Sequence, residues 1–132
     1  MVSPTGKTDI RKDARGNGEF GAARKKDDGS TYTHRGLDLK CTVGQEIKMP
    51  CTGKITRESR PYVSDPRWRG VYISAVRGDF KIFYMVPKLE LIGTTVREGE
   101  VIGHAQDIGI KYPGVTPHIH LEVVALDPMV LL

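Results

Sequence analysis

The sequence predicts an all-β fold, a compact antiparallel β-sheet domain built from many short strands. Apolar and polar residues alternate over short runs, turns rich in Gly and Pro separate these runs at close spacing, and no segment keeps a helical period. The chain of 132 residues has the length of one domain and is long enough to bury a core without a framework of disulfides.

The N-terminal part of the chain differs in composition from the rest. Residues 1–17 are polar and rich in Gly, Lys, Arg and Asp, so we expect a flexible arm there. The predicted domain then spans residues 18–132. It begins with a short stretch around Phe20, which stands between glycines, and a polar loop over 25–33 leads to the first strand.

From residue 34 onward the pattern is that of strands. Leu37 and Leu39 alternate with polar neighbours, which is typical of a half-buried strand. Further strands are expected over 46–49, 54–58, 71–76, 80–86, within 94–102 and over 118–124. Residues 59–70 hold two prolines and the single Trp and predict a long loop. Because long loops in compact domains are often functional, this loop is a candidate wall for a groove.

Composition and charge narrow the classes of partner. The net charge is +4 with both signs interspersed, which favours solubility and some affinity for anionic polymers. A basic stripe with interleaved aromatics, as a nucleic-acid interface needs, is missing, and no apolar stretch is long enough to insert into a membrane. Residues 1–7 lack the apolar core of a signal peptide. We therefore expect a protein that is cytoplasmic when made or that is packaged in a larger particle such as a virion.

Two cysteines, Cys41 and Cys51, stand at the ends of a predicted hairpin. A disulfide between them is geometrically feasible, and the alternative is a pair of small buried hydrophobic residues. Cys41 is an odd number of residues from Asp38, so we expect it on the opposite face of that strand.

Two short motifs at opposite ends of the chain carry three of its four histidines. His34 and Asp38 stand four residues apart, and His118 and His120 stand two apart. Residues an even number apart in a β-strand point to the same face, so each pair shares a face. If the two strands are neighbours, two imidazoles and a carboxylate converge with one imidazole to spare. This set suits Zn²⁺ with three protein ligands, an open position for water and a base beside it.

Glu122 extends the second motif, because it shares the predicted strand face of His118 and His120. Two interpretations stay open. Its carboxylate accepts a hydrogen bond from a metal-bound imidazole and orients the ring, or it is a solvated or salt-bridged strand residue.

At these motifs the chain resembles the lysostaphin-like M23 zinc metallopeptidases, which cut peptides of bacterial peptidoglycan. That family carries His-x-x-x-Asp and His-x-His motifs. The resemblance continues in the Phe-Gly-Ala-Ala-Arg run of 20–24, the Gly-Leu-Asp-Leu run of 36–39, the Gly-containing turn of 96–103 and the Asp-Pro pair at 127–128. It covers residues 18–132, nearly the whole chain.

The resemblance implies a compact antiparallel β fold with a narrow groove, acting on peptidoglycan peptides of the bacterial cell wall. It also implies a Zn²⁺ ion held by His34, Asp38 and His120, with His118 as the catalytic histidine. Carried over to this chain, His118 takes a proton from a zinc-bound water and passes it toward the leaving amine.

One position departs from the family pattern. Active members of the family that the chain resembles usually have a second catalytic histidine in a Tyr-x-His element. At the matching position this chain has Val86. Losing one oxyanion donor costs roughly 10²–10³ in rate. Two other residues are candidate oxyanion helpers. Tyr84 can donate a hydrogen bond from its phenol, and His104 can supply the missing donor if its loop folds over the groove. The alternative for His104 is an exposed loop histidine without a role in the site. The departure resembles a branch that contains the LECT-two chemotaxin, and similar domains occur in phage tail and prophage proteins.

Three hypotheses about function follow. The first is a zinc endopeptidase that hydrolyses peptidoglycan peptides and is weakened by Val86. The second is a catalytically inactive, zinc-bearing binding or structural module, for example a subunit of a phage tail assembly. The third is a scaffold whose site holds no metal.

Overall fold

The computed structural model of the chain describes residues 1–13, 16–17, 23–25, 31–33, 36–76 and 78–126, with side chains described over 1–11, 36–76 and 78–124. His34 and the Asp-Pro pair at 127–128 therefore lie outside the described residues. Asp38, His118, His120 and Glu122 lie within them.

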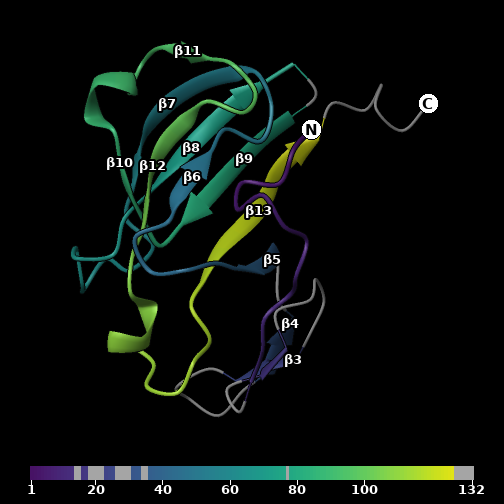
Figure 1. The fold of residues 1–132 in the computed structure, drawn as a ribbon, viewed down its shortest axis with the longest axis vertical. Coiled ribbons are helices and arrows are strands. Elements are labelled where there is room, and N and C mark those ends of the chain that lie inside the picture. Colours follow the sequence, from purple (N-terminus) through teal and green to yellow (C-terminus); the bar gives the residue numbers. More distant parts are fainter. Residues whose placement is uncertain (14–15, 18–22, 26–30, 34–35, 77, 127–132) are drawn as a thin grey trace.

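A six-stranded antiparallel sheet forms the body of the protein (Figure 1). Its strand order is β11-β7-β8-β9-β13-β5. The strands are β5 (Gly36–Lys40), β7 (Gly53–Ser59), β8 (Gly70–Ala75), β9 (Gly78–Phe83), β11 (Thr95–Val96) and β13 (His118–Leu126). The last strand in sequence thus lies inside the sheet, between β9 and β5.

A second, three-stranded sheet packs beside the first with the order β10-β12-β6 (Figure 1). Its strands are β6 (Glu46–Lys48), β10 (Met85–Pro87) and β12 (Val101–Ala105). The remaining elements are β1 (Lys12–Asp13), β2 (Gly16–Asn17), β3 (Ala23–Lys25), β4 (Thr31–Thr33) and two 3₁₀ turns, Leu89–Leu91 and Ile108–Ile110. The part of the chain that the structure describes has no α-helix, and the all-β prediction is confirmed. It also holds no helix long and apolar enough to cross a membrane.

Side chains from both sheets share one core. Ile55, Ile73 and Ile82 of the larger sheet are fully buried, and so are Ile47 and Ile102 of the smaller one. Full burial of such a side chain stabilises the fold by about 1.5–3 kcal/mol. This shared core fixes the two sheets against each other and so gives β13 and β5 a rigid support.

The chain changes sheet at Tyr84. The sequence predicts one strand over 80–86, but the structure has two, because β9 ends at Phe83 and β10 begins at Met85. Tyr84 has a φ of 73°, which is uncommon for a bulky residue, and its backbone N–H donates to the Arg69 carbonyl at 2.8 Å. Residues on both sides of this break favour strands, so their periodicity gives no sign of it.

The N-terminal segment, residues 1–11, packs on the body of the protein. The Lys48 N–H of β6 donates to the Pro4 carbonyl at 2.9 Å, and the Arg11 N–H donates to the Asp38 carbonyl of β5 at 2.8 Å. These bonds join both ends of residues 1–11 to strand edges; the flexible arm expected over residues 1–17 stays a prediction. Composition does not reveal backbone hydrogen bonds of this kind, because they depend on the strand edges that the segment meets.

Candidate functional site

Strands β5 and β13 bring the two sequence motifs together. They pair in antiparallel register, and His120 is the direct cross-strand partner of Asp38. Side chains at such directly opposite positions lie on the same face of the sheet, with Cβ atoms about 4.5–5.5 Å apart. The pairing therefore places a carboxylate and an imidazole from distant parts of the sequence side by side.

The polar atoms of this pair are in direct contact. His120 Nδ1 lies 3.0 Å from Asp38 Oδ1, and His118 Nε2 lies 3.8 Å from Asp38 Oδ2. All three residues are buried, with at most 9% of their surface exposed. Burying a polar group costs free energy unless the group is hydrogen-bonded or paired. The fold therefore tolerates this cluster because its polar atoms are paired with one another.

Glu122 holds the other nitrogen of His120. His120 Nε2 lies 3.1 Å from Glu122 Oε1, and Lys81 Nζ lies 2.9 Å from Glu122 Oε2. Burial alone raises the pKa of Glu122, but the hydrogen bonds from Lys81 and His120 outweigh it and lower that pKa. The salt bridge to Lys81 is the second interpretation. The contact with His120 is compatible with the first, which concerns a metal-bound imidazole and stays a prediction.

The hydrogen bonding of His118 leaves one of its two ring nitrogens basic. Its Nδ1 lies 2.7 Å from the Thr116 carbonyl, which can only accept a hydrogen bond, so Nδ1 carries a proton. Burial lowers the pKa of His118, opposed by the nearby Asp38 carboxylate. The ring is therefore neutral near pH 7, and Nε2 can take a proton, as a general base requires.

An aromatic cluster adjoins His118. The Tyr84 ring meets the His118 ring edge to face, with centroids 5.5 Å apart. The Tyr62 hydroxyl lies 2.7 Å from both the Tyr84 and the Tyr112 hydroxyls. Tyr62 and Tyr112 come from two long loops, and the sequence analysis missed them because no local pattern predicts that their hydroxyls meet.

The loop between β7 and β8 supports this cluster. Trp68 of the loop is buried together with Ile108 and Val115, and the tyrosine rings pack against these three. The Trp68 Nε1–H donates to Asp65 Oδ2 at 3.1 Å, which fixes the loop from inside. The expected long loop is therefore present and contributes Tyr62 to the site.

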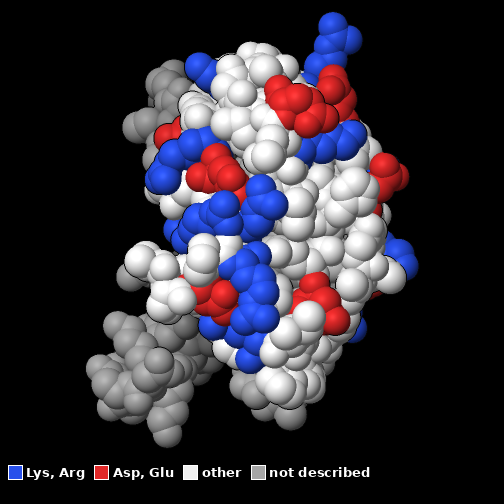
Figure 2. Space-filling view, turned by 90° about the vertical axis from the view of Figure 1, so that its left-hand side faces the viewer, with Lys and Arg blue, Asp and Glu red and all other residues white. Residues whose placement is uncertain are grey.

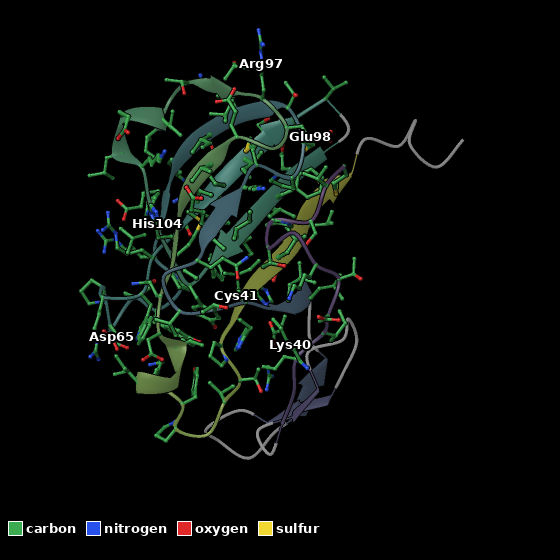
Figure 3. All side chains as sticks on the ribbon, viewed as in Figure 1. Lys40, Cys41, Asp65, Arg97, Glu98 and His104 are labelled. Atoms are coloured by element: carbon green, nitrogen blue, oxygen red, sulfur yellow. The ribbon has the colours of Figure 1, made fainter. Side chains whose placement is uncertain are left out.

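His104 and Val86 lie together on the smaller sheet. His104 is on β12, directly opposite Val86 on β10, and both side chains are exposed. Figure 3 shows His104 at this edge of the protein. The sequence places His104 in a loop after a turn, but the structure places it within a strand. Among the contacts described, none joins His104 to His118 or Tyr84.

Arg11 is a further site residue that the sequence analysis did not single out. Arg11 as a whole residue is 4% exposed, and its Nε–H donates to Asp38 Oδ2 at 3.1 Å. An isolated arginine in a polar stretch carries no signal for burial, so sequence reasoning had nothing from which to find it.

The cysteines do not take part in the site. Cys41 and Cys51 are both free thiols that pack against the main core. Burial raises the pKa of the Cys41 thiol to about 11. A thiol with that pKa is protonated at neutral pH.

A zinc ion needs three or four donor atoms arranged around one point. Within the residues described, no group of three His, Cys, Asp or Glu side chains is arranged to hold a metal, and His34 is not among those residues. Ligands about 2.0–2.1 Å from a tetrahedral zinc lie about 3.3 Å from one another. The 3.0 Å between Asp38 Oδ1 and His120 Nδ1 is close to that separation. These two atoms therefore fit two coordination positions of a single zinc ion.

One face of the protein, which includes the loop between β7 and β8, carries both charges. Basic side chains form a band interrupted by acidic ones on the face drawn in Figure 2. Asp65, labelled on that side in Figure 3, pairs with Arg67 at 3.1 Å. Arg60 pairs with Glu58 at 3.3 Å. The signs are thus interspersed, as the composition predicts.

Known proteins resemble the chain in sequence. No family model matches it. Leukocyte cell-derived chemotaxin-2 of Bos taurus is 34% identical over 122 residues, which are 91% of this chain and 76% of that protein. The protein of the same name from Mus musculus is 30% identical over 115 residues, or 83% of this chain and 69% of that protein.

Solved structures share the fold. Csd3 of Helicobacter pylori superposes with a TM-score of 0.61 and 19% identity over 92% of this chain and 33% of Csd3. The catalytic domain of the antimicrobial peptidase lysostaphin from Staphylococcus simulans gives 0.57 and 21% identity over 92% of this chain and 91% of that domain. Lysostaphin in solution gives 0.57 and 17% identity over 90% of this chain, which spans 46% of its length.

Proposed function

The chain belongs to the lysostaphin-like M23 family, and from this premise we propose that it is a zinc metalloendopeptidase-type domain acting on peptides of bacterial peptidoglycan. The single observation that carries the proposal is the buried contact between Asp38 Oδ1 and His120 Nδ1, with His118 beside it. The site of action that follows is the bacterial cell wall.

The proposed metal ligands are His34, Asp38 and His120. The contact between His120 Nε2 and Glu122 supports this choice, because metal-bound imidazoles usually donate their second N–H to a carboxylate. With the proton on Nε2, Nδ1 is the nitrogen whose lone pair would serve the metal, and it lies beside Asp38 Oδ1. When bound, zinc supplies a Lewis acid that acidifies a water and polarises the scissile carbonyl.

His118 is the proposed general base. Its Nδ1–H is held by the Thr116 carbonyl, so Nε2 receives the proton that the attacking water loses. The same Nε2–H can then donate to the leaving amine. Because His118 is buried, few waters compete for this nitrogen.

The missing second histidine weakens this machinery. Val86 carries no donor, so it cannot stabilise a developing oxyanion. Of the two candidate helpers, Tyr84 is the better supported, because its ring contacts His118. His104 faces the same side of the smaller sheet as Val86 but is exposed. We expect slow peptide hydrolysis in which the Tyr84 hydroxyl supplies part of the missing stabilisation.

A second candidate function is a binding or structural module. Val86 favours it, as does the similarity to leukocyte cell-derived chemotaxin-2. In that case the same site holds zinc and a peptide without cutting it, for example within a phage tail or similar assembly.

The test is the release of free amino groups from purified peptidoglycans of several cross-bridge types. Wild-type protein and His118→Ala are compared, with zinc content measured in both. Release by the wild type alone supports the peptidase. No release from either, with one zinc per chain in both, favours the binding module.

A further inference from the structure

The N-terminal segment delivers an arginine to the centre of the proposed metal site. Arg11 and Asp38 form an ion pair in which each side chain is only 5% exposed, with Arg11 Nε 3.1 Å from Asp38 Oδ2. A buried charge is tolerated only when a partner compensates for it, so this pair is a specific feature of the fold.

Backbone contacts fix where Arg11 lies. Residues 9–11 run antiparallel along the outer edge of β5: Ile10 forms a β-bridge with Leu39, and the Lys40 N–H donates to the Asp9 carbonyl at 2.8 Å. The Arg11 N–H also donates to the Asp38 carbonyl at 2.8 Å. The guanidinium therefore reaches Asp38 from a backbone segment that is held against β5 by hydrogen bonds.

The two oxygens of Asp38 have different neighbours. Oδ1 lies 3.0 Å from His120 Nδ1, whereas Oδ2 accepts from Arg11 and lies 3.8 Å from His118 Nε2. The terminal torsion of an aspartate is broad, so the carboxylate plane is set by its hydrogen bonds and not by a rotamer. A partner on Oδ2 thus decides where Oδ1 points.

We propose that Arg11 is a positioning residue for the metal ligand Asp38. By binding Oδ2, it keeps Oδ1 turned toward His120 Nδ1, the pair of donors that fits a zinc ion. The inference rests on the proposed function, because it takes Asp38 and His120 as ligands. According to this proposal, the N-terminal segment contributes a side chain to the metal site.

The experiment measures zinc affinity in the full chain by competition with a chromophoric chelator. The variants are Arg11→Gln, which removes the charge, and Arg11→Lys, which keeps the charge without the planar guanidinium. Lys7→Gln is the matched control, because Lys7 is an exposed cation of the same segment. The absorption spectrum of the cobalt-substituted protein reports the ligand geometry independently of any activity.

We expect Arg11→Gln to weaken zinc binding by about 10–100-fold, the usual cost of losing a partner of a metal ligand. Arg11→Lys should recover part of this loss with an altered cobalt spectrum, and Lys7→Gln should behave as the wild type. If circular dichroism shows that Arg11→Gln does not fold, the proposal is tested by the zinc affinity and the cobalt spectrum of Arg11→Lys.

Three kinds of result overturn the proposal. Unchanged affinity in a folded Arg11→Gln, or wild-type affinity and spectrum in Arg11→Lys, means that the guanidinium does not orient Asp38. Tighter zinc binding in Arg11→Gln means that Arg11 merely neutralises Asp38 and competes with the metal. Wild-type protein that binds no zinc rejects the proposed metal site itself, a failure distinct from the other two.

Discussion

Tyr84 and His118 meet edge to face, with ring planes at 90° and centroids 5.5 Å apart. This geometry is favourable for aromatic rings, because the positive edge of one faces the negative face of the other. It depends on the positive φ of Tyr84, which turns the chain between the two sheets. The residue with the unusual backbone conformation is therefore also the residue that contacts the proposed base. Strained backbone conformations are commonly found at functional sites.

Replacing Tyr84 by Phe tests its hydroxyl. Tyr84→Phe keeps the ring on His118, so the fold should lose only about 1 kcal/mol from one hydrogen bond. If the hydroxyl stabilises the oxyanion, peptide hydrolysis should fall by about 10²–10³-fold. Tyr112→Phe is the control, because Tyr112 pairs with the same Tyr62 hydroxyl. Equal losses of hydrolysis in the two variants would show that the cluster acts only on stability.

Val86→His should raise peptide hydrolysis, because it restores a donor at the position where active family members are expected to carry a histidine. The expected gain in kcat is about 10²–10³-fold. The side chain of Val86 is 40% exposed, so the fold should accept the larger ring. Val63→His, at a site 98% exposed, controls for the added imidazole. A gain that survives in the double variant Val86→His, His118→Ala would contradict the proposed base.

Zinc should raise the melting temperature of the wild type, because a ligand that binds only the folded state stabilises it by about 2.7 kcal/mol at a hundred times its Kd. His34→Ala and His120→Ala should abolish this response. Asp38→Ala should in addition destabilise the metal-free protein by about 3–5 kcal/mol, because it leaves Arg11 buried without its carboxylate. Thermal melts with zinc and with chelator measure both effects; melts that do not respond to chelator would argue against a bound metal.

Cys41 should react slowly with iodoacetamide at pH 8. Burial raises its pKa from 9.0 to about 11, so the reactive thiolate is about a hundredfold scarcer than for an ordinary thiol. Since the folded pKa is the higher one, stability from this group is full below pH 9 and is lost as the pH rises through 11. Labelling rates against pH, followed by mass spectrometry, should show a midpoint near 11. A native rate at pH 8 equal to that in denaturant would refute the burial effect.

The sequence was sufficient to predict the all-β fold and the shared strand face of His118 and His120. Even spacing dictates that His118 and His120 share a face, and alternation around Leu37 and Leu39 predicts the strand that carries Asp38. These are local patterns, and local patterns are what a single sequence displays. The placement of His34 stays a prediction, since it lies outside the described residues.

Features that depend on distant contacts could not be predicted in this way. Arg11 stands in a polar stretch and becomes buried only because β5 offers an edge and Asp38 a counter-charge. The hydroxyls of Tyr62 and Tyr112 meet through two loops whose paths are set by Trp68 and its neighbours. His104 looks like a loop residue because a glycine precedes it, but pairing with β10 makes it part of a strand.

The register of β5 against β13 joins residues that are 82 positions apart in the chain, as the Asp38–His120 pair shows. Closing such a long loop costs entropy before any contact is gained, and long-range strand pairing is correspondingly slow. The donors therefore come together only once β13 has entered between β9 and β5. During refolding, the appearance of zinc affinity should follow the burial of the main core, and a metal-sensitive dye would time the last step of sheet assembly.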